Sequence, residues 1–265
     1  MRNIIISLAA LFAILLTLGC SSFSVGPAQT VGKKPELPSV ASMEIPPLGE
    51  SDALAKAAAA KTNIAYLTAT TAVSYWTLTI ELALLEPVAL FALAHTVDPE
   101  PLPDNSGSVW TIGDNGFQAQ LTGKVAADSV RWSMSVTGGD LVNFVWFEGT
   151  STITGNAGYW VFHDTTLASG IYPELIKFTY ETSDAREEVK VEVVKQNDIE
   201  YGSYLQWTAL GAEMFFESFD ATQPETVLIS WNEAVESGYI ENVTSGEKYC
   251  WDTKSNGHKD IPCAL

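Results

Sequence analysis

Few side chains in this sequence combine residue type and spacing in a way that supports catalysis. The three histidines are His95, His163 and His258, and they lie far apart in the chain. We expect His95 near a helix C-terminus, where it favours the helix dipole, His163 on a strand, and His258 beside a turn. The sequence contains no G-x-S-x-G, H-E-x-x-H or C-x-x-C motif. We therefore expect no catalytic residue and no cofactor. A glycan-acting enzyme with two catalytic carboxylates ranks third, behind the two non-enzymatic functions that the rest of the sequence favours.

A proline-rich loop gathers oxygen-bearing side chains at Asp98, Glu100, Asp104 and Asn105. Calcium favours such carboxylate and amide ligands. Their spacing fits no calcium-binding loop, so we predict a solvated connection and no metal site.

Three tryptophans, Trp132, Trp146 and Trp160, recur every fourteen residues. This spacing matches the length of a strand plus its turn, and tryptophans usually belong to the core. Stacking of these rings on a sugar, or lining of an apolar pocket, stays open.

Two cysteines near the C-terminus, Cys250 and Cys263, flank an Asn256-Gly257 pair that is typical of a two-residue hairpin turn. A turn there places the cysteines directly opposite each other, within disulfide range. One feature disagrees with this register, because Pro262 opposite Trp251 forfeits a ladder hydrogen bond. We expect a disulfide, with two free thiols as the alternative.

The N-terminal residues 1–19 have the pattern of an export signal. Arg2 precedes an apolar run from Ile4 to Leu18. At about 15 residues the run is short for a membrane span of ~20 and suits a signal-peptide core.

The end of this run, Leu16-Thr17-Leu18-Gly19-Cys20, resembles the lipobox of bacterial lipoproteins. In that class a signal peptidase cuts before the cysteine, which then carries diacylglycerol and a further acyl chain such as palmitate. The resemblance covers about residues 1–22 and implies cleavage between Gly19 and Cys20 and lipid attachment at Cys20. An ordinary cleaved signal and an uncleaved anchor are the alternatives.

The residue after the lipid-bearing cysteine is Ser21, not the aspartate that marks inner-membrane retention in many bacteria with two membranes. The resemblance therefore implies an exported, lipid-anchored protein of the cell envelope, at the outer membrane where the host has one. It leaves open whether the body faces the periplasm or the outside.

The composition excludes other partners. The chain has 265 residues, 14 basic and 32 acidic, and a formal charge of −18. This acidity argues against nucleic acid and against an anionic membrane surface as electrostatic partners. An acyl anchor binds a membrane without any basic patch. Hydrophobic residues make up 46 % of the chain, which excludes wholesale disorder.

Two segments precede the strands. Residues 20–50 contain several prolines and no hydrophobic period, which predicts a lipidated cysteine followed by a flexible tether. Residues 51–100 predict a helical segment, in which Pro87 starts a second helix or kinks the first. One narrow stripe of this segment is polar and its other faces are apolar, which is typical of a core helix packed on a sheet. A membrane span and a detachable, partner-binding helix are the alternatives. The stripe consists of Thr70, Ser74, Thr77 and Glu81.

From about residue 108 the hydrophobic period changes to two, and turn signals predict three hairpin registers. The segment 141–147 is apolar on both faces, with Phe147 on one and Phe144 on the other. The expected pairs are Ile112–Ala119 and Trp110–Leu121 around Asn115-Gly116, Val136–Leu141 and Trp132–Val145 around Gly138-Gly139, and Tyr180–Val189 and Phe178–Val191 around Asp184-Ala185.

The sequence thus predicts a mainly β (α+β) protein. An antiparallel meander of about 10–12 strands in residues 101–265 curls into a barrel or half-barrel with the helical segment packed on it. Residues 51–265 then form one folded unit.

The function that we expect is non-enzymatic binding of an apolar small molecule or an envelope protein by a lipid-anchored module. The alternative is a structural or adhesive module with a filled core.

Overall fold

The computed structural model describes residues 34–45, 64–114, 116–139, 141–164, 173–252 and 259–263. All of them belong to one compact unit, residues 32–265.

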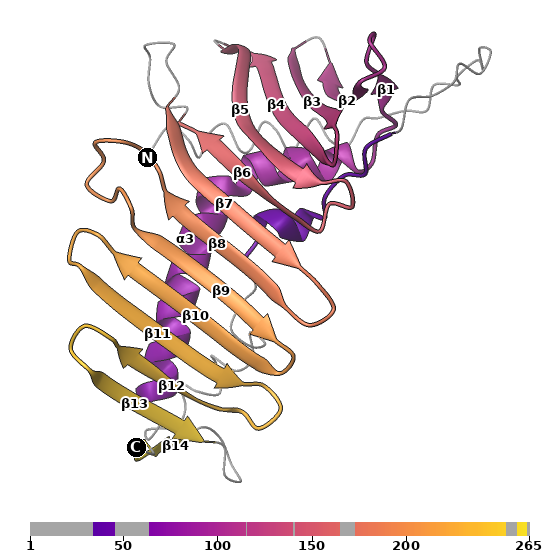
Figure 1. Cartoon of the computed structure of the whole chain (residues 1–265). Coiled ribbons are helices and arrows are strands. Elements are labelled where there is room, and N and C mark those ends of the chain that lie inside the picture. The colour runs from indigo at the N-terminus through magenta and orange to yellow at the C-terminus, as the bar shows by residue number, and fades with distance from the viewer. Residues whose placement is uncertain are drawn as a thin grey trace. The chain divides into compact units, whose positions relative to one another are not determined.

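The described residues form one long helix, one short 3-10 helix and a single sheet of fourteen strands. Each strand pairs antiparallel with the next along the chain, so the sheet is a continuous meander (Figure 1). The predicted antiparallel meander is confirmed, but it has fourteen strands where the sequence predicts about 10–12. Its elements are η1 (Val40–Met43), α3 (Ile64–Ala94), β1 (Glu100–Pro101), β2 (Gly107–Asp114), β3 (Phe117–Ala126), β4 (Ser129–Gly138), β5 (Leu141–Thr152), β6 (Ala157–His163), β7 (Glu174–Thr182), β8 (Glu187–Val193), β9 (Tyr204–Leu210), β10 (Glu213–Asp220), β11 (Glu225–Asn232), β12 (Ser237–Asn242), β13 (Glu247–Asp252) and β14 (Lys259–Ile261).

One face of the sheet carries the hydrophobic core. Alternate residues along each strand point to this face, as the pleat requires. The opposite face carries mostly polar side chains, such as Gln120 on β3, Thr179 on β7 and Gln206 on β9. The core residues of successive strands include Leu121, Trp132, Phe147, Trp160, Phe178, Val191, Trp207, Phe216, Ile229, Ile240 and Trp251.

The sheet is not closed, so of the two predicted forms, barrel and half-barrel, the barrel is wrong. In the described residues β1 and β14 do not pair. Helix α3 contacts β12–β14 with its N-terminal part and β2 and β3 with its C-terminal part. Its 31 residues span about 46 Å, and the nine steps from β3 to β12 span about 43 Å. The helix therefore crosses the strands and holds the two ends of the sheet apart (Figure 1).

Two of the predicted hairpin registers are confirmed. Around the first turn Ile112 pairs with Ala119, and in the β7–β8 hairpin Tyr180 pairs with Val189. That second register also places Glu181 opposite Glu188, an unfavourable pair of like charges.

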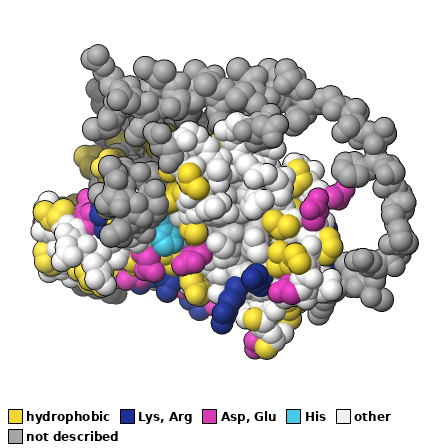
Figure 2. All heavy atoms as spheres, turned by 90° about the horizontal axis from the view of Figure 1, so that it is seen from above, with side chains coloured by type: hydrophobic (Ala, Val, Ile, Leu, Met, Phe, Trp, Pro, Cys, Tyr) yellow, Lys and Arg dark blue, Asp and Glu magenta, His cyan; other side chains and the backbone are white. Residues whose placement is uncertain are grey.

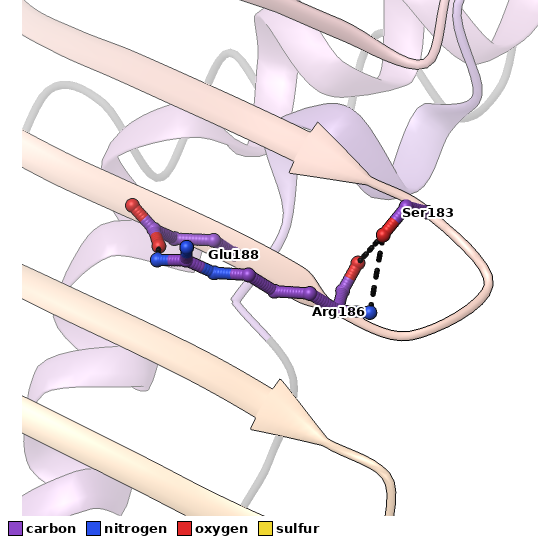
Figure 3. A network of polar contacts seen from close by, with 3 residues as sticks. All are labelled: Ser183, Arg186 and Glu188. Carbon is purple, nitrogen blue, oxygen red and sulfur yellow. Dashed lines mark hydrogen bonds and ion pairs between the residues drawn. The ribbon is translucent and has the colours of Figure 1, made fainter.

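The β7–β8 turn offsets this repulsion (Figure 3). Arg186 forms an ion pair with Glu188. The Oγ of Ser183 accepts a hydrogen bond from the backbone N–H of Arg186 at 3.1 Å. These contacts close the turn at the position that the sequence predicts.

The predicted β4–β5 register is wrong. Trp132 pairs with Gly149, not with Val145, because two irregularities interrupt the ladder. Asn143 adopts a positive φ of 50°, and its backbone N–H donates to the Oγ1 of Thr137. The extra residues let Phe144 and Phe147 both become buried, although simple alternation places them on opposite faces.

Glycines make room for two of the tryptophans. Trp132 lies on β4 between Gly123 and Gly149, and Gly149 also pairs with Trp160 on β6. A Cβ at Gly123 would lie 2.4 Å from the Trp132 ring.

Part of the segment predicted as a flexible tether, residues 20–50, contributes to the same core, because Met43 and Ile45 are buried.

Candidate interaction site

Helix α3 has two different long faces. One face points at the sheet and consists largely of small or medium-sized residues at spacings of three and four. This stripe is Ala65, Tyr66, Ala69, Thr70, Val73, Thr77, Ile80, Leu84, Pro87, Leu90, Phe91 and Ala94. The helix is continuous through Pro87, so of the two alternatives for this proline, a second helix or a kink, the second helix is not formed.

The opposite face of α3 carries large hydrophobic side chains that are exposed. Tyr75 is 65 % exposed and Leu82 is 66 % exposed, and Ile64, Leu67, Leu78 and Leu85 are exposed as well. Such a row is unusual on a helix whose other face is already buried, because solvent-facing helix surfaces are normally polar.

The polar stripe that the sequence shows along this helix does not form its solvent-exposed face. Thr70 and Thr77 are buried against the sheet side. The Thr70 Oγ1 donates to the Tyr66 carbonyl at 3.0 Å, which satisfies the hydroxyl within the helix. The solvent face instead carries large apolar side chains, although others, such as Leu84 and Phe91, are buried against the sheet.

A carboxylate from the far end of the chain fixes the start of α3. The two oxygens of Asp260, on β14, accept hydrogen bonds from the backbone N–H groups of Ile64 and Ala65, each at 3.0 Å. These donors have no partner within the helix, and the negative charge favours the helix N-terminus.

Replacing Asp260 by alanine is expected to lower the free energy of unfolding by about 1 kcal/mol, because a helix loses its N-terminal cap. Chemical denaturation of the two proteins measures this change. Asp260→Asn keeps one acceptor and should lose less. A stability equal to that of the unsubstituted protein would contradict the capping role.

By length and composition, α3 is long and apolar enough to cross a membrane. In its most apolar stretch of 18 residues, 33 % is buried within the protein. Its cap on β14 and its contact with the sheet from end to end instead make it part of the folded body.

A pocket of about 350 Å³ lies beside the C-terminal end of α3. Its lining includes the charged or titratable residues Lys34, Glu36, His95 and Asp98 together with Trp110. This mixture of charges and apolar surface does not suit an apolar ligand, which prefers a mostly hydrophobic wall. Acidic, basic and hydrophobic side chains are likewise interspersed on the face shown in Figure 2.

The histidines stay apart. His95 directly follows α3 and makes an edge contact with Phe91. His163 ends β6 with its Nε2 3.8 Å from a Glu148 oxygen. His258 lies outside the described residues.

The most buried carboxylate of the described ion pairs is Asp164, next to His163. Its Oδ2 accepts a hydrogen bond from the Lys195 ammonium at 2.8 Å. This hydrogen bond and the negative charge raise the pKa of Lys195. The pair joins the end of β6 to the chain after β8, which is a structural role.

The acidic, proline-rich loop at residues 98–105 forms turns that its own side chains stabilise. The Asp104 Oδ1 accepts hydrogen bonds from the backbone N–H and the hydroxyl of Ser106, and these bonds lower the pKa of Asp104. Within the described part of the chain, no group of three or more His, Cys, Asp and Glu side chains is arranged to hold a metal ion.

The three tryptophans divide between core and margin. Trp132 and Trp160 are buried, and their indole N–H groups donate to the hydroxyls of Ser151 and Ser42. Trp146, at the β5 irregularity, is only partly buried.

The structure contains the disulfide Cys250–Cys263, with the Cα atoms 5.3 Å apart. The predicted register around it is wrong, because Cys250 pairs with Ile261 and Trp251 with Asp260. This shift places Pro262 after the end of β14, where it removes no ladder hydrogen bond. The predicted turn, like Gly19 and Cys20, lies outside the described residues.

No protein-family model, curated protein or solved structure matches the chain. The fold itself defines a mainly β protein, in which one helix spans an open antiparallel meander. Sequence reasoning kept a detachable, partner-binding helix as an alternative but did not identify which face of α3 would be exposed. Its one signal was the apolar composition of the helix on nearly all sides.

Proposed function

We propose that this chain is a lipid-anchored protein of the cell envelope that binds a protein partner through the exposed face of α3. The observation that carries the proposal is the row of exposed large hydrophobic side chains on a helix that is fixed to the body at its first turn. In this proposal the open sheet is a half-barrel that holds the helix as a rigid platform.

A protein partner is favoured over an apolar small molecule. The pocket beside α3 is lined by charged as well as apolar groups. The exposed row extends along the helix axis, which suits a second protein surface more than a compact ligand.

The anchor rests on the resemblance of the N-terminus to a lipobox. Replacing Cys20 by serine is expected to move the protein from the membrane fraction to the soluble fraction, because the acyl chains have no other attachment point. Immunoblotting of the two fractions measures this shift. Ser21→Ala is the matched control and should stay in the membrane fraction. A Cys20→Ser protein that remains with the membrane would contradict the anchor.

Partner binding is tested by labelling exposed side chains with hydroxyl radicals, in intact host cells and on purified protein. Tyr75 lies on the exposed face of α3, whereas Tyr201 and Tyr249 lie elsewhere with 55 % and 56 % exposure. We expect Tyr75 to be labelled several-fold less in cells, and the other two tyrosines to be labelled equally. Equal labelling of Tyr75 in both samples would refute the proposed function.

A further inference from the structure

The exposed face of α3 has the repeat of a coiled-coil seam. Successive residues on this face are three or four positions apart, and every one of them is exposed. This 3–4 spacing is the heptad pattern that packs one helix against another. We define the seam as Ile64, Thr68, Thr71, Tyr75, Leu78, Leu82, Leu85 and Ala89.

The middle of the seam is its most apolar part, from Tyr75 to Leu85. Thr68, which precedes this part, presents less polarity than its residue type suggests. The Thr68 Oγ1 donates to the Ile64 carbonyl at 2.8 Å, so its hydroxyl is already bonded within the helix and its methyl group remains for packing. From Ile64 to Ala89 the seam extends about 38 Å, which matches more than three heptads.

Charge decides which helix fits. The α3 sequence contains no lysine or arginine, and its charged residues are Glu81 and Glu86. Glu81 directly precedes a seam residue and Glu86 directly follows one, so they occupy the two positions that flank a coiled-coil seam. Flanking positions select partners by charge.

A second copy of the chain is a poor match for this seam. In a parallel pair of α3 helices, Glu81 of one copy faces Glu86 of the other, five positions on. In an antiparallel pair that overlaps along the whole seam, Glu81 faces Ser74 and Glu86 faces Ala65 of the other copy, so neither glutamate gains a cation. The formal charge of −18 adds repulsion between whole copies.

A bilayer is also a poor match. Insertion of this face would bring Glu81 and Glu86 towards hydrocarbon, and charged groups there are costly. Helices that lie on membranes carry lysine and arginine for the anionic headgroups, and α3 has none.

Resting on the proposed function, we infer that the partner of this protein presents an amphipathic helix of about 25 residues, with an apolar seam flanked by lysine or arginine. The helix lies along α3 from Ile64 to Ala89, and its cations face Glu81 and Glu86.

The test uses the full chain with Cys20→Ser and two synthetic helical peptides of about four heptads. Both peptides have the same apolar seam, but one carries lysine and the other glutamate at all flanking positions. Fluorescence anisotropy measures the dissociation constants. We expect the lysine peptide to bind at least tenfold more tightly at low salt, and 0.5 M NaCl to reduce this preference, because salt screens exposed charges.

Variants separate the seam from its flanks. Leu78→Lys with Leu82→Lys should abolish binding of the lysine peptide. Glu81→Gln with Glu86→Gln should leave binding but remove the preference between peptides. Thr179→Lys, on the polar face of β7, is the matched control and should leave the affinity unchanged.

Several results would overturn the inference. They are equal affinity for both peptides, a preference for the glutamate peptide, or no binding of either at about 100 μM. Dimerisation that Leu82→Lys abolishes would identify a second copy as the occupant. Binding to phosphatidylglycerol vesicles would identify a membrane. Amide exchange within residues 46–63 that is faster in the Leu78→Lys protein than in the unsubstituted protein would identify this segment of the same chain as the occupant of the seam.

The inference and the proposed function can fail separately. Protection of Tyr75 in cells without a preference for the lysine peptide would refute only the nature of the partner. Absence of that protection would refute partner binding altogether.

Discussion

Replacing Trp160 by alanine is expected to lower the free energy of unfolding by about 3–5 kcal/mol, the range found for large aromatic residues removed from a core. Trp160 is 0 % exposed. Its ring lies 5.2 Å from that of Phe91 on α3 and 5.6 Å from that of Phe147 on β5, measured between ring centroids. Its Nε1–H donates to the Ser42 hydroxyl at 3.1 Å.

These contacts explain why the effect should be large. One side chain joins the sheet, the spanning helix and the short helix η1, so its loss leaves a cavity and an unpaired hydroxyl at Ser42. Urea unfolding, followed by circular dichroism, measures the change. Trp160→Phe keeps most of the ring contacts and should cost less.

Trp146 provides the matched control, because it is only partly buried against the same core. Trp146→Ala should therefore cost clearly less than Trp160→Ala. Equal losses for the two substitutions would contradict the central position of Trp160.

Removing the disulfide is expected to cost about 3 kcal/mol. The bond closes a loop between residues 13 positions apart, and a crosslink of that length stabilises mainly by restricting the unfolded chain. The loop also carries Asp260, which caps α3. Loss of the bond should therefore loosen the first turn of the helix as well.

The measurement compares the Cys20→Ser protein with the same protein carrying Cys250→Ser and Cys263→Ser. Urea unfolding gives the stability difference, and hydrogen exchange at Ile64 and Ala65 reports the cap. Reductant should destabilise the first protein and leave the second unchanged. Unaltered exchange at the two cap residues would show that Asp260 holds its place without the disulfide.

Local sequence signals located most of the strands and two of the three hairpin registers correctly. Asn115-Gly116 and Asp184-Ala185 define turns whose geometry sets the register by itself, and the pairs Ile112–Ala119 and Tyr180–Val189 confirm it. The register predicted from Gly138-Gly139 is wrong because β5 contains two irregularities, one beside Asn143 and one between Val145 and Phe147, which no turn signal encodes.

The open sheet was equally beyond local patterns. Alternation along a strand shows which face is apolar, but not whether the last strand meets the first. Helix α3 makes that decision, because one continuous helix of 31 residues reaches from β2 and β3 to β12–β14.

The sequence by itself determined the class of fold, the order of its strands and the apolar character of α3, because each depends on neighbours within a few residues. Only the tertiary structure decided that the sheet stays open, that Asp260 caps the helix, and which side of α3 is covered. The sheet covers the face of α3 that runs from Ala65 to Ala94, which includes large side chains such as Leu84 and Phe91 as well as small ones. Leu78, Leu82 and Leu85 are thereby left on the surface, where the proposed partner binds.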